Sequence, residues 1–223
     1  LGDVYKRQID NSITKLNIYS YQIQAITPDG AGPTATTDRL VMGPALTVPY
    51  RCNFATDDQF ALWNVIDANN DEYTWKRETT LAAAYYYYNE DGETGGDDWL
   101  VSSPIHLEKN KIYRLKFKLQ SYDVGYPEKV AVHLGTGASV AEQTTLLGDY
   151  EVESNTFVEY KVILPERLES GNYHISFHCH SEPYMFILYV TDVLLEEVSE
   201  GVLSGVVTNG QTPLEGVEAV SYT

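Results

Sequence analysis

The sequence predicts an all-β fold, and two observations support this: the spacing of the apolar residues and the aromatic content. Apolar and polar residues alternate with a period of two through most of the chain, which is typical of strands with one buried face. The 223 residues include 18 Tyr against 6 Phe and 3 Trp, and tyrosine is enriched in half-buried strands. A chain of this length can bury a sizeable core.

The alternation is clearest in Lys111–Gln120 ("KIYRLKFKLQ"), where Tyr113, Leu115, Phe117 and Leu119 share one face. Further strands are predicted in Tyr19–Thr27, Lys129–Gly135, Phe157–Pro165, Asn172–Cys179 and Met185–Glu197. The one candidate helix, Thr79–Asn89, holds its small and aromatic residues in blocks rather than at helical spacing. We therefore expect it to run into a strand.

The charge of the chain limits its partners. Asp and Glu number 32 against 15 Lys and Arg, for a net charge of −17. This balance argues against binding to nucleic acid or to anionic lipid and suits divalent cations. The longest dense apolar run, Met185–Val190, is too short to cross a bilayer, so no membrane insertion is expected.

Two cysteines do not amount to a disulfide framework. The alternation around Cys52 and Cys179 points both side chains into the core. Buried free thiols and a bridge between the two both remain open.

Composition divides the chain. Gly, Pro and Thr are frequent in Thr27–Asp38, two prolines lie in Met42–Tyr50, and the long segment that follows closes at the acidic Leu194–Gly201. The division predicted is residues 9–45, 46–199 and 200–223. Codons for Leu1–Gln8 ("LGDVYKRQ") can match a transposase adapter used in sequencing libraries, so residues 1–8 are expected to be a scar. The alternative is a genuine strand.

The middle segment carries the most specific resemblance. Its motifs are "F…LWNVIDANNDEYTW" (Phe54–Trp75), "DDWLVSSPIHL" (Asp97–Leu107), "YPEKVAVHLGTG" (Tyr126–Gly137) and "MFILYVTDVLLEE" (Met185–Glu197). On these, Leu46–Glu197 resembles the choice-of-anchor J domains, relatives of the cleaved-adhesin and MAM-like jelly rolls in surface proteins of anaerobic bacteria. The resemblance implies a jelly-roll β-sandwich. Ala55 departs from it, because relatives often have an acidic residue there, which weakens a cation site on the first strand.

The flanking segments resemble two other β-sandwiches. Ile13–Leu40, with "YSYQIQAI" and "DGAGP", is similar to the last two strands of a fibronectin type III domain, in which a Tyr at the position of Tyr19 bonds to backbone. The "GVVTNGQTPLEGVEAV" of the tail resembles the start of a carboxypeptidase-regulatory-like domain. Together the three resemblances imply a secreted or surface-exposed bacterial protein, with this chain a monomeric part of it.

The spacing of polar residues in "DANNDEYTWKRE" raises the question of a Ca²⁺ site. Asp67, Asn69, Asp71 and Glu78 occupy positions 1, 3, 5 and 12 of an EF-hand-like loop, but position 6 is Glu72 rather than Gly. An EF-hand is therefore not expected. A different Ca²⁺ site that uses the first three residues stays open beside an Asx-rich turn whose side chains bond local backbone.

Two further carboxylates are candidates for such a site. In the resembled family an Asp recurs at the position of Asp98, before Trp99, and it either bonds backbone or binds a structural ion. Asp192 would approach the first strand if the terminal strands pair. We expect Trp99 to lie in the core.

Tyrosines are the candidate ligand-binding residues. The "YYYY" of Tyr85–Tyr88 puts two rings on each face of a strand, and one pair is expected in the core. The other pair, with tyrosines from nearby loops, would stack on sugar rings; the alternative is that they are ordinary half-buried strand residues. The predicted ligand-binding residues are Tyr86, Tyr88, Tyr122, Tyr126 and Tyr184.

The histidines offer a weaker metal hypothesis. His174, His178 and His180 alternate along one strand, and the last two are spaced to chelate Zn²⁺. No carboxylate is evidently placed to complete the set, so a solvent-facing row is favoured.

Catalysis finds no support in the motifs. The sequence has no G-x-S-x-G elbow, no H-E-x-x-H and no phosphate-binding loop. We therefore expect no enzyme. A binding module for glycan or extracellular protein is the preferred hypothesis, and a structural spacer attached to a protease or adhesin is the alternative. A jelly-roll hydrolase would need two facing carboxylates in a cleft.

Overall fold

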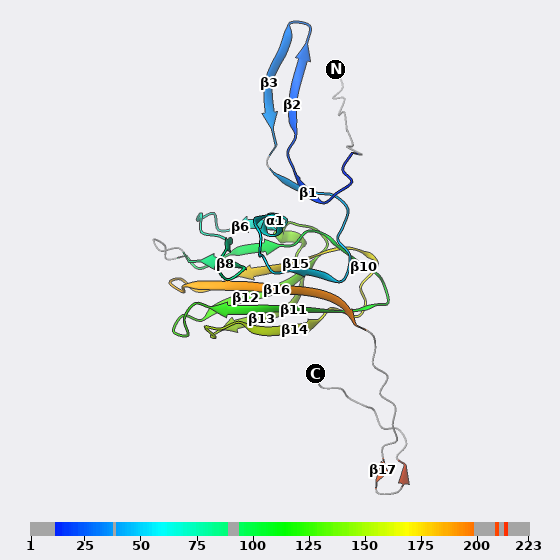
Figure 1. Cartoon of the computed structure of the whole chain (residues 1–223), viewed down its shortest axis with the longest axis vertical. Helices are drawn as coiled ribbons and strands as arrows, with labels where there is room; N and C mark the ends of the chain where they lie inside the picture. The colour runs from blue at the N-terminus through cyan, green and yellow to red at the C-terminus, as the bar shows by residue number, and fades with distance from the viewer. Residues whose placement is uncertain (1–11, 38, 89–93, 199–207, 210–211, 214–223) are drawn as a thin grey trace.

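The computed structural model describes residues 12–37, 39–88, 94–198, 208–209 and 212–213. In these ranges the regular secondary structure is almost all strand, with one short α-helix, which confirms the all-β prediction. From β5 (Tyr50–Cys52) to β16 (Ile187–Val198) it forms two stacked antiparallel sheets of six strands each (Figure 1).

Each sheet is built around one long strand. The first, which we call the β15 sheet, has the order β13 (Thr145–Val152), β12 (Glu128–Gly135), β15 (Gly171–Cys179), β9 (Asp98–Val101) and β6 (Asn64–Asp67), with β10 (Ile105–Leu107) also on β15. The second, the β16 sheet, has the order β14 (Val158–Ile163), β11 (Ile112–Ser121), β16, β8 (Ala83–Tyr87) and β7 (Lys76–Glu78), with β5 also on β16.

Strand β16 divides one edge between two short partners. Val193 to Leu195 pair with β5, and Ile187 to Val190 pair with β8. The first and last strands of the sandwich therefore do pair. Between the two partners the register with β11 shifts, and Asp192 has a φ of 50°, so the strand bulges at this point.

The core lies between the sheets and agrees with the predicted faces. Burial alternates residue by residue along β11, with Tyr113, Leu115, Phe117 and Leu119 buried. Phe117 meets Phe177 of β15 edge to face at a ring-centroid distance of 5.3 Å. The segment that was the one candidate helix runs into strand β8, as expected.

Both cysteines are buried and free. Cys52 lies in β5 and Cys179 at the end of β15, in different sheets. The structure therefore supports two free thiols and does not support a disulfide bond between them.

One short helix was not predicted, α1 (Asp57–Ala61). The Thr56 side chain caps it by accepting from the backbone N–H of Gln59 at 3.2 Å. A Thr followed three residues later by Gln is the sequence signal that identifies this start.

The residues before the sandwich form a hairpin that projects away from it (Figure 1). Its strands are β2 (Gln22–Thr27) and β3 (Gly30–Thr36), and at its base β1 (Asn17–Tyr19) pairs with β4 (Leu40–Met42). The Tyr19 hydroxyl donates to the Lys15 carbonyl at 2.9 Å, the kind of backbone bond expected of it.

The described part of the tail is a strand pair, β17 (Thr208–Asn209) with β18 (Thr212–Pro213). The proposed scar at residues 1–8 lies outside the described residues. The division of the chain into three domains stays a prediction.

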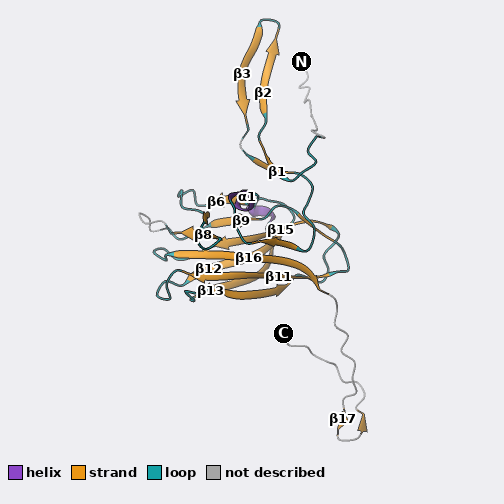
Figure 2. Cartoon of the chain, in the orientation of Figure 1, coloured by secondary structure: helices purple, strands orange, loops and turns teal. Residues whose placement is uncertain are grey.

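The end of the sandwich that holds the candidate residues is formed by the connections that follow β6, β8, β11 and β15 (Figure 2). We call it the loop end. Residues far apart in the sequence are close together here because the strands that precede them are neighbours in the two sheets.

Truncation of the central ring tests the core. Phe117 is fully buried and contacts rings of both sheets, so Phe117→Ala should lower the free energy of unfolding by about 3–5 kcal/mol. Urea denaturation followed by tyrosine and tryptophan fluorescence measures this loss. The control is Leu146→Ala, whose side chain is 58% exposed in β13, and which should change stability by no more than about 0.5 kcal/mol. Equal losses in the two variants would contradict the assigned core.

Candidate functional site

An aromatic hollow of about 240 Å³ opens at the loop end, and we call it the tyrosine concavity. It is lined by Tyr88, Tyr122, Asp123, Tyr126, Tyr184 and Phe186. These residues come from three connections, those after β8, β11 and β15, which the topology brings to the same end of the β16 sheet.

Backbone hydrogen bonds fix the three segments to one another. The Tyr88 N–H donates to the Phe186 carbonyl at 3.1 Å, and the Tyr122 N–H donates to the Ile187 carbonyl at 2.9 Å. The Phe186 ring is shared by its neighbours, with centroid distances of 4.7 Å to Tyr122, 5.7 Å to Tyr88 and 6.1 Å to Tyr126. The rings are therefore arranged in advance of any ligand.

Local turn geometry presents the exposed rings. An Asx-type turn, in which the Asp123 side chain accepts from the Gly125 N–H at 2.8 Å, orients the connection between Tyr122 and Tyr126. Tyr184 has a φ of 63°, a left-handed conformation that is strained for a bulky residue. These three tyrosines are 54%, 47% and 56% exposed. Such strain is typical of functional positions.

Four of the five predicted tyrosines line this concavity, and the prediction of Tyr86 is wrong. Tyr86 is only 1% exposed and packs against Trp75 at a centroid distance of 6.3 Å. Burial raises the pKa of its hydroxyl far above the ordinary value. The error has a simple cause: Tyr88 follows the last residue of β8, so the alternation that pairs it with Tyr86 does not extend to it.

The concavity has two further residues that sequence analysis missed, Asp123 and Phe186. Phe186 was visible only as part of an apolar run, and nothing local indicated that it contacts rings from two other connections. A single carboxylate in a surface turn has no distinguishing signal among 32 acidic residues.

A buried carboxyl lies beside the concavity. Glu128, the first residue of β12, is fully buried and accepts a 2.5 Å hydrogen bond from the Ser181 hydroxyl. Burial raises its pKa to about 7, and the Ser181 hydroxyl and the Phe186 backbone N–H offset only part of that shift. The carboxyl thus connects the start of β12 to the segment that bears Phe186.

The predicted cation residues Asp67 and Asp71 form a turn after β6. Asp67 accepts from the N–H groups of Asp71 at 3.2 Å and Glu72 at 2.9 Å, and Asp71 accepts from the Tyr73 N–H at 2.9 Å. This is the geometry of the Asx-rich turn that was the alternative to a cation site. Asn69 donates from its side chain to the Gly95 carbonyl at 3.0 Å.

Asp98 is buried directly beside this turn, since it pairs with Asp67 across strands β9 and β6. It is 0% exposed, and burial, with the nearby charges of Asp67 and Asp71, raises its pKa to about 7. Within the described ranges its Oδ1 atom and the buried Oδ1 of Asn69 have no hydrogen-bond partner. Two unpartnered buried oxygens among carboxylates fit an oxygen-binding cation.

The carboxylates and histidines alone do not form a metal centre. Across residues 12–198 as far as they are described, no three His, Cys, Asp or Glu side chains are grouped to hold an ion. A cation at Asp98 would thus need amide, backbone or water oxygens as well, which is ordinary for Ca²⁺.

Asp192 belongs to a different part of the surface. It forms an ion pair with Lys118 at 2.8 Å on the outer face of the β16 sheet, because the bulge turns its side chain outward. Asp192 was a predicted cation ligand together with Asp67 and Asp98. In the structure its partner is instead Lys118.

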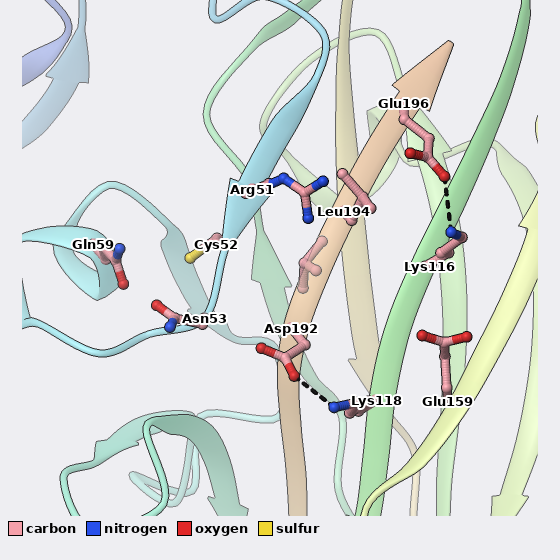
Figure 3. Close-up of a pocket in the computed structure, with 11 residues that line it drawn as sticks. Arg51, Cys52, Asn53, Gln59, Lys116, Lys118, Glu159, Asp192, Leu194 and Glu196 are labelled. Carbon is pink, nitrogen blue, oxygen red and sulfur yellow. Dashed lines mark hydrogen bonds and ion pairs between the residues drawn. The ribbon is translucent and has the colours of Figure 1, made fainter. Parts of the chain in front are cut away.

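A second hollow, about 650 Å³, runs over this outer face, and we call it the charged groove (Figure 3). Arg51, Asn53 and Gln59 lie on one side, and residues of β11, β16 and β14 on the other. Its three carboxylates each lie within 3.0 Å of a lysine, in the pairs Lys116–Glu196, Lys118–Asp192 and Lys161–Glu159. A ligand would have to exchange these ion pairs.

The histidines do not form the solvent-facing row that was expected. His174 is buried and bonds to the Ser102 carbonyl at 2.6 Å. His178 stacks on Trp99 at a centroid distance of 4.0 Å and bonds to Asp97 at 2.8 Å. His180 bonds to Asp149 at 2.8 Å. Trp99 is buried, as predicted.

The geometry of the acidic groups gives no support to a hydrolase. Asp98 and Glu128 are the carboxyls whose pKa is raised to about 7, but both are fully buried. Catalytic carboxylates must reach a substrate in a cleft.

Comparison with known proteins supports the fold. No family model matches the chain, and no curated protein matches it. Among solved structures, the K1 cleaved adhesin domain of Lys-gingipain from Porphyromonas gingivalis has a TM-score of 0.55 at 19% identity and covers 68% of this chain and 99% of that chain. The K3 domain of the same protein has a TM-score of 0.52 at 19% identity, covering 66% and 96%.

At this identity the likeness shows the fold alone. It confirms the jelly-roll β-sandwich and the resemblance to cleaved-adhesin domains at the level of architecture. The narrower resemblance to choice-of-anchor J domains stays a prediction. No helix in the described ranges is long and apolar enough to cross a membrane.

The two buried carboxyls predict a pH dependence of stability. Their native pKa values of about 7 lie above the ordinary 3.8 for Asp98 and 4.5 for Glu128. Between about pH 4 and pH 7 the folded chain therefore holds protons that the unfolded chain releases, and the free energy of unfolding falls as pH rises. In chelator, Asp98→Asn should reduce this fall by a few kcal/mol.

Urea denaturation at pH 4.5 and pH 7.5 measures the difference. Asp29→Asn, an exposed change of the same kind in the turn between β2 and β3, is the control and should leave the fall unchanged. A fall of the same size in Asp98→Asn would contradict the assignment.

Proposed function

We propose that the chain is a non-catalytic extracellular binding module of a multi-domain bacterial surface or secreted protein, and that the tyrosine concavity takes its glycan or protein ligand. One observation supports this above the others: tyrosines from three separate connections open into one hollow. Three of them, Tyr122, Tyr126 and Tyr184, are about half exposed.

The chemistry of the concavity suits recognition. Tyrosine rings present a large apolar face and a polar hydroxyl, so they stack on sugar rings or side chains while bonding to polar groups at the edge. Clustered exposed aromatics on a soluble domain are typical of interaction sites. Because backbone bonds and the Asx turn hold the rings, little ordering entropy is lost when a ligand binds.

The second candidate is a purely structural spacer in a protease or adhesin. The charged groove favours it, because the carboxylates that line this groove are already neutralised by lysines. The spacer interpretation does not explain the exposed and strained Tyr184.

We also propose a structural Ca²⁺ at the loop end, with Asp98 as its central ligand and Asp67, Asn69 and Asp71 as neighbours. The unpartnered Oδ1 atoms of Asp98 and Asn69 support it. A bound cation would neutralise the buried Asp98 carboxylate and fix the turn after β6.

The binding proposal predicts loss of affinity on removal of rings. The full chain should bind saturably to one member of a panel of glycans and mucin-type proteins. The double variant Tyr122→Ala/Tyr184→Ala should weaken this binding about tenfold or more, because each ring contributes stacking energy. Isothermal titration calorimetry gives the dissociation constants.

The control for this experiment is Ile163→Ala, a side chain that is 48% exposed at the end of β14. It should bind as the unchanged chain does. A well-folded chain that binds nothing on the panel would leave the spacer standing.

The calcium proposal predicts a shift in melting temperature. Millimolar Ca²⁺ should raise it relative to chelator, because an ion that binds only the folded state stabilises it by about 2.7 kcal/mol at a hundred times its Kd. Differential scanning fluorimetry measures the shift, which Asp98→Asn should abolish and Asp29→Asn should retain. An unchanged melting temperature in calcium and in chelator would count against the site.

A further inference from the structure

We propose that the tyrosine concavity takes a positively charged side chain, the Lys or Arg of a basic protein partner. This inference rests on the proposed function, which makes the concavity the ligand site, and it adds the charge class of the ligand. Three features of the concavity support it: its rings, its single charge and its surroundings.

The rings present the electrostatic surface that a cation prefers. Of the described residues that line it, five are aromatic, four Tyr and one Phe. The face of each ring is negative, and a cation within about 6 Å of the ring centroid is attracted to it. Because Tyr88, Tyr122 and Tyr126 are grouped around Phe186, one ammonium or guanidinium group in the hollow faces several rings.

Among the described residues that line the concavity, Asp123 is the charged one. Its Oδ1 atom accepts from the Gly125 N–H, so the carboxylate is held in the turn. Within the described ranges no Lys, Arg or His side chain forms an ion pair with it, so its charge is available to a ligand. An aromatic hollow with one carboxylate at its edge is suited to a cationic group.

The surroundings add to this potential. Lys129, three residues after Tyr126 in the sequence, is paired with Glu182 at 2.8 Å, so its charge is offset. The whole chain has a net charge of −17. Such a field attracts a basic partner over a Debye length and speeds its association.

Two other ligand classes use these features less well. A neutral sugar would stack on the rings but gain nothing from the charge of Asp123. A phosphocholine headgroup would put an ammonium on the rings, but its phosphate would meet the carboxylate and the acidic surface. A lysine or arginine side chain benefits from the rings, from the carboxylate and from the net charge together.

The experiment compares probes of matched shape. The full chain is titrated with a short lysine-containing peptide, with the same peptide acetylated on the lysine Nζ atom, and with an arginine version. Phosphocholine and a neutral glycan panel are titrated in parallel. We expect the charged peptides to bind about tenfold or more tightly than the acetylated one, and their affinity to fall as salt rises.

Variants of Tyr122 separate the contribution of the aromatic ring from that of its hydroxyl, and a variant of Asp123 separates the contribution of the charge from that of the side-chain shape. Tyr122→Phe keeps the ring and should bind within about threefold of the unchanged chain, while Tyr122→Leu removes it and should bind about tenfold more weakly. Asp123→Asn keeps the turn acceptor and removes the charge, so it should weaken binding and flatten the salt dependence. Asp58→Asn, an exposed acid in α1, removes the same charge at a distance and should change neither.

The outcomes distinguish the two levels of the proposal. Equal binding of the charged and acetylated peptides, or full affinity in Tyr122→Leu, would overturn the cationic ligand. Binding of phosphocholine without binding of the peptides would overturn the protein partner. Glycan binding that requires the tyrosines, without peptide binding, would retain the proposed function and overturn this inference. Binding of no probe by the folded chain would overturn both.

Discussion

The contact between Phe117 and Phe177 joins the two sheets, and the rest of the molecule depends on it. Phe117 belongs to β11 and Phe177 to β15, and both are fully buried. Their edge-to-face packing sets the distance between the sheets, as aromatic pairs do in sandwich cores. On this stacked scaffold the strand order brings the ends of β8, β11 and β15 to the same end of the sandwich, where the tyrosine concavity lies.

The loop end concentrates features that are unfavourable to folding. Asp98 and Glu128 are buried carboxyls, and Tyr184 has a strained backbone. Buried charge and strain both cost stability, and proteins retain them mainly where binding requires them. In the charged groove Asp192 also has a positive φ, but ion pairs between neighbouring strands satisfy the charged groups internally. This difference is the physical reason for which we propose the tyrosine concavity, and not the charged groove, as the ligand site.

Properties that depend on neighbouring residues alone could be predicted from the sequence. The buried face of Lys111–Gln120 follows from alternation alone, and it is the face observed. Properties that depend on contacts between distant segments could not be predicted. Tyr86 was assigned to a ligand because the strand was assumed to continue through Tyr88. Asp192 does approach the first strand, as expected from the pairing of the terminal strands, but its ion pair is with Lys118 and not with the cation residues. The partner of His178 is Asp97, 81 residues away, so the stacked and bonded histidine could not be anticipated.

The bulge at Asp192 has a consequence for the register of β16. A one-residue slip in a regular strand would move every side chain to the opposite face. In β16 the bulge separates the half that pairs with β8, Ile187 to Val190, from the half that pairs with β5. Because the bulge lies between the two halves, a shift of register in one half need not pass into the other. The pairing that positions Phe186 beside β8 is therefore set independently of the pairing with β5.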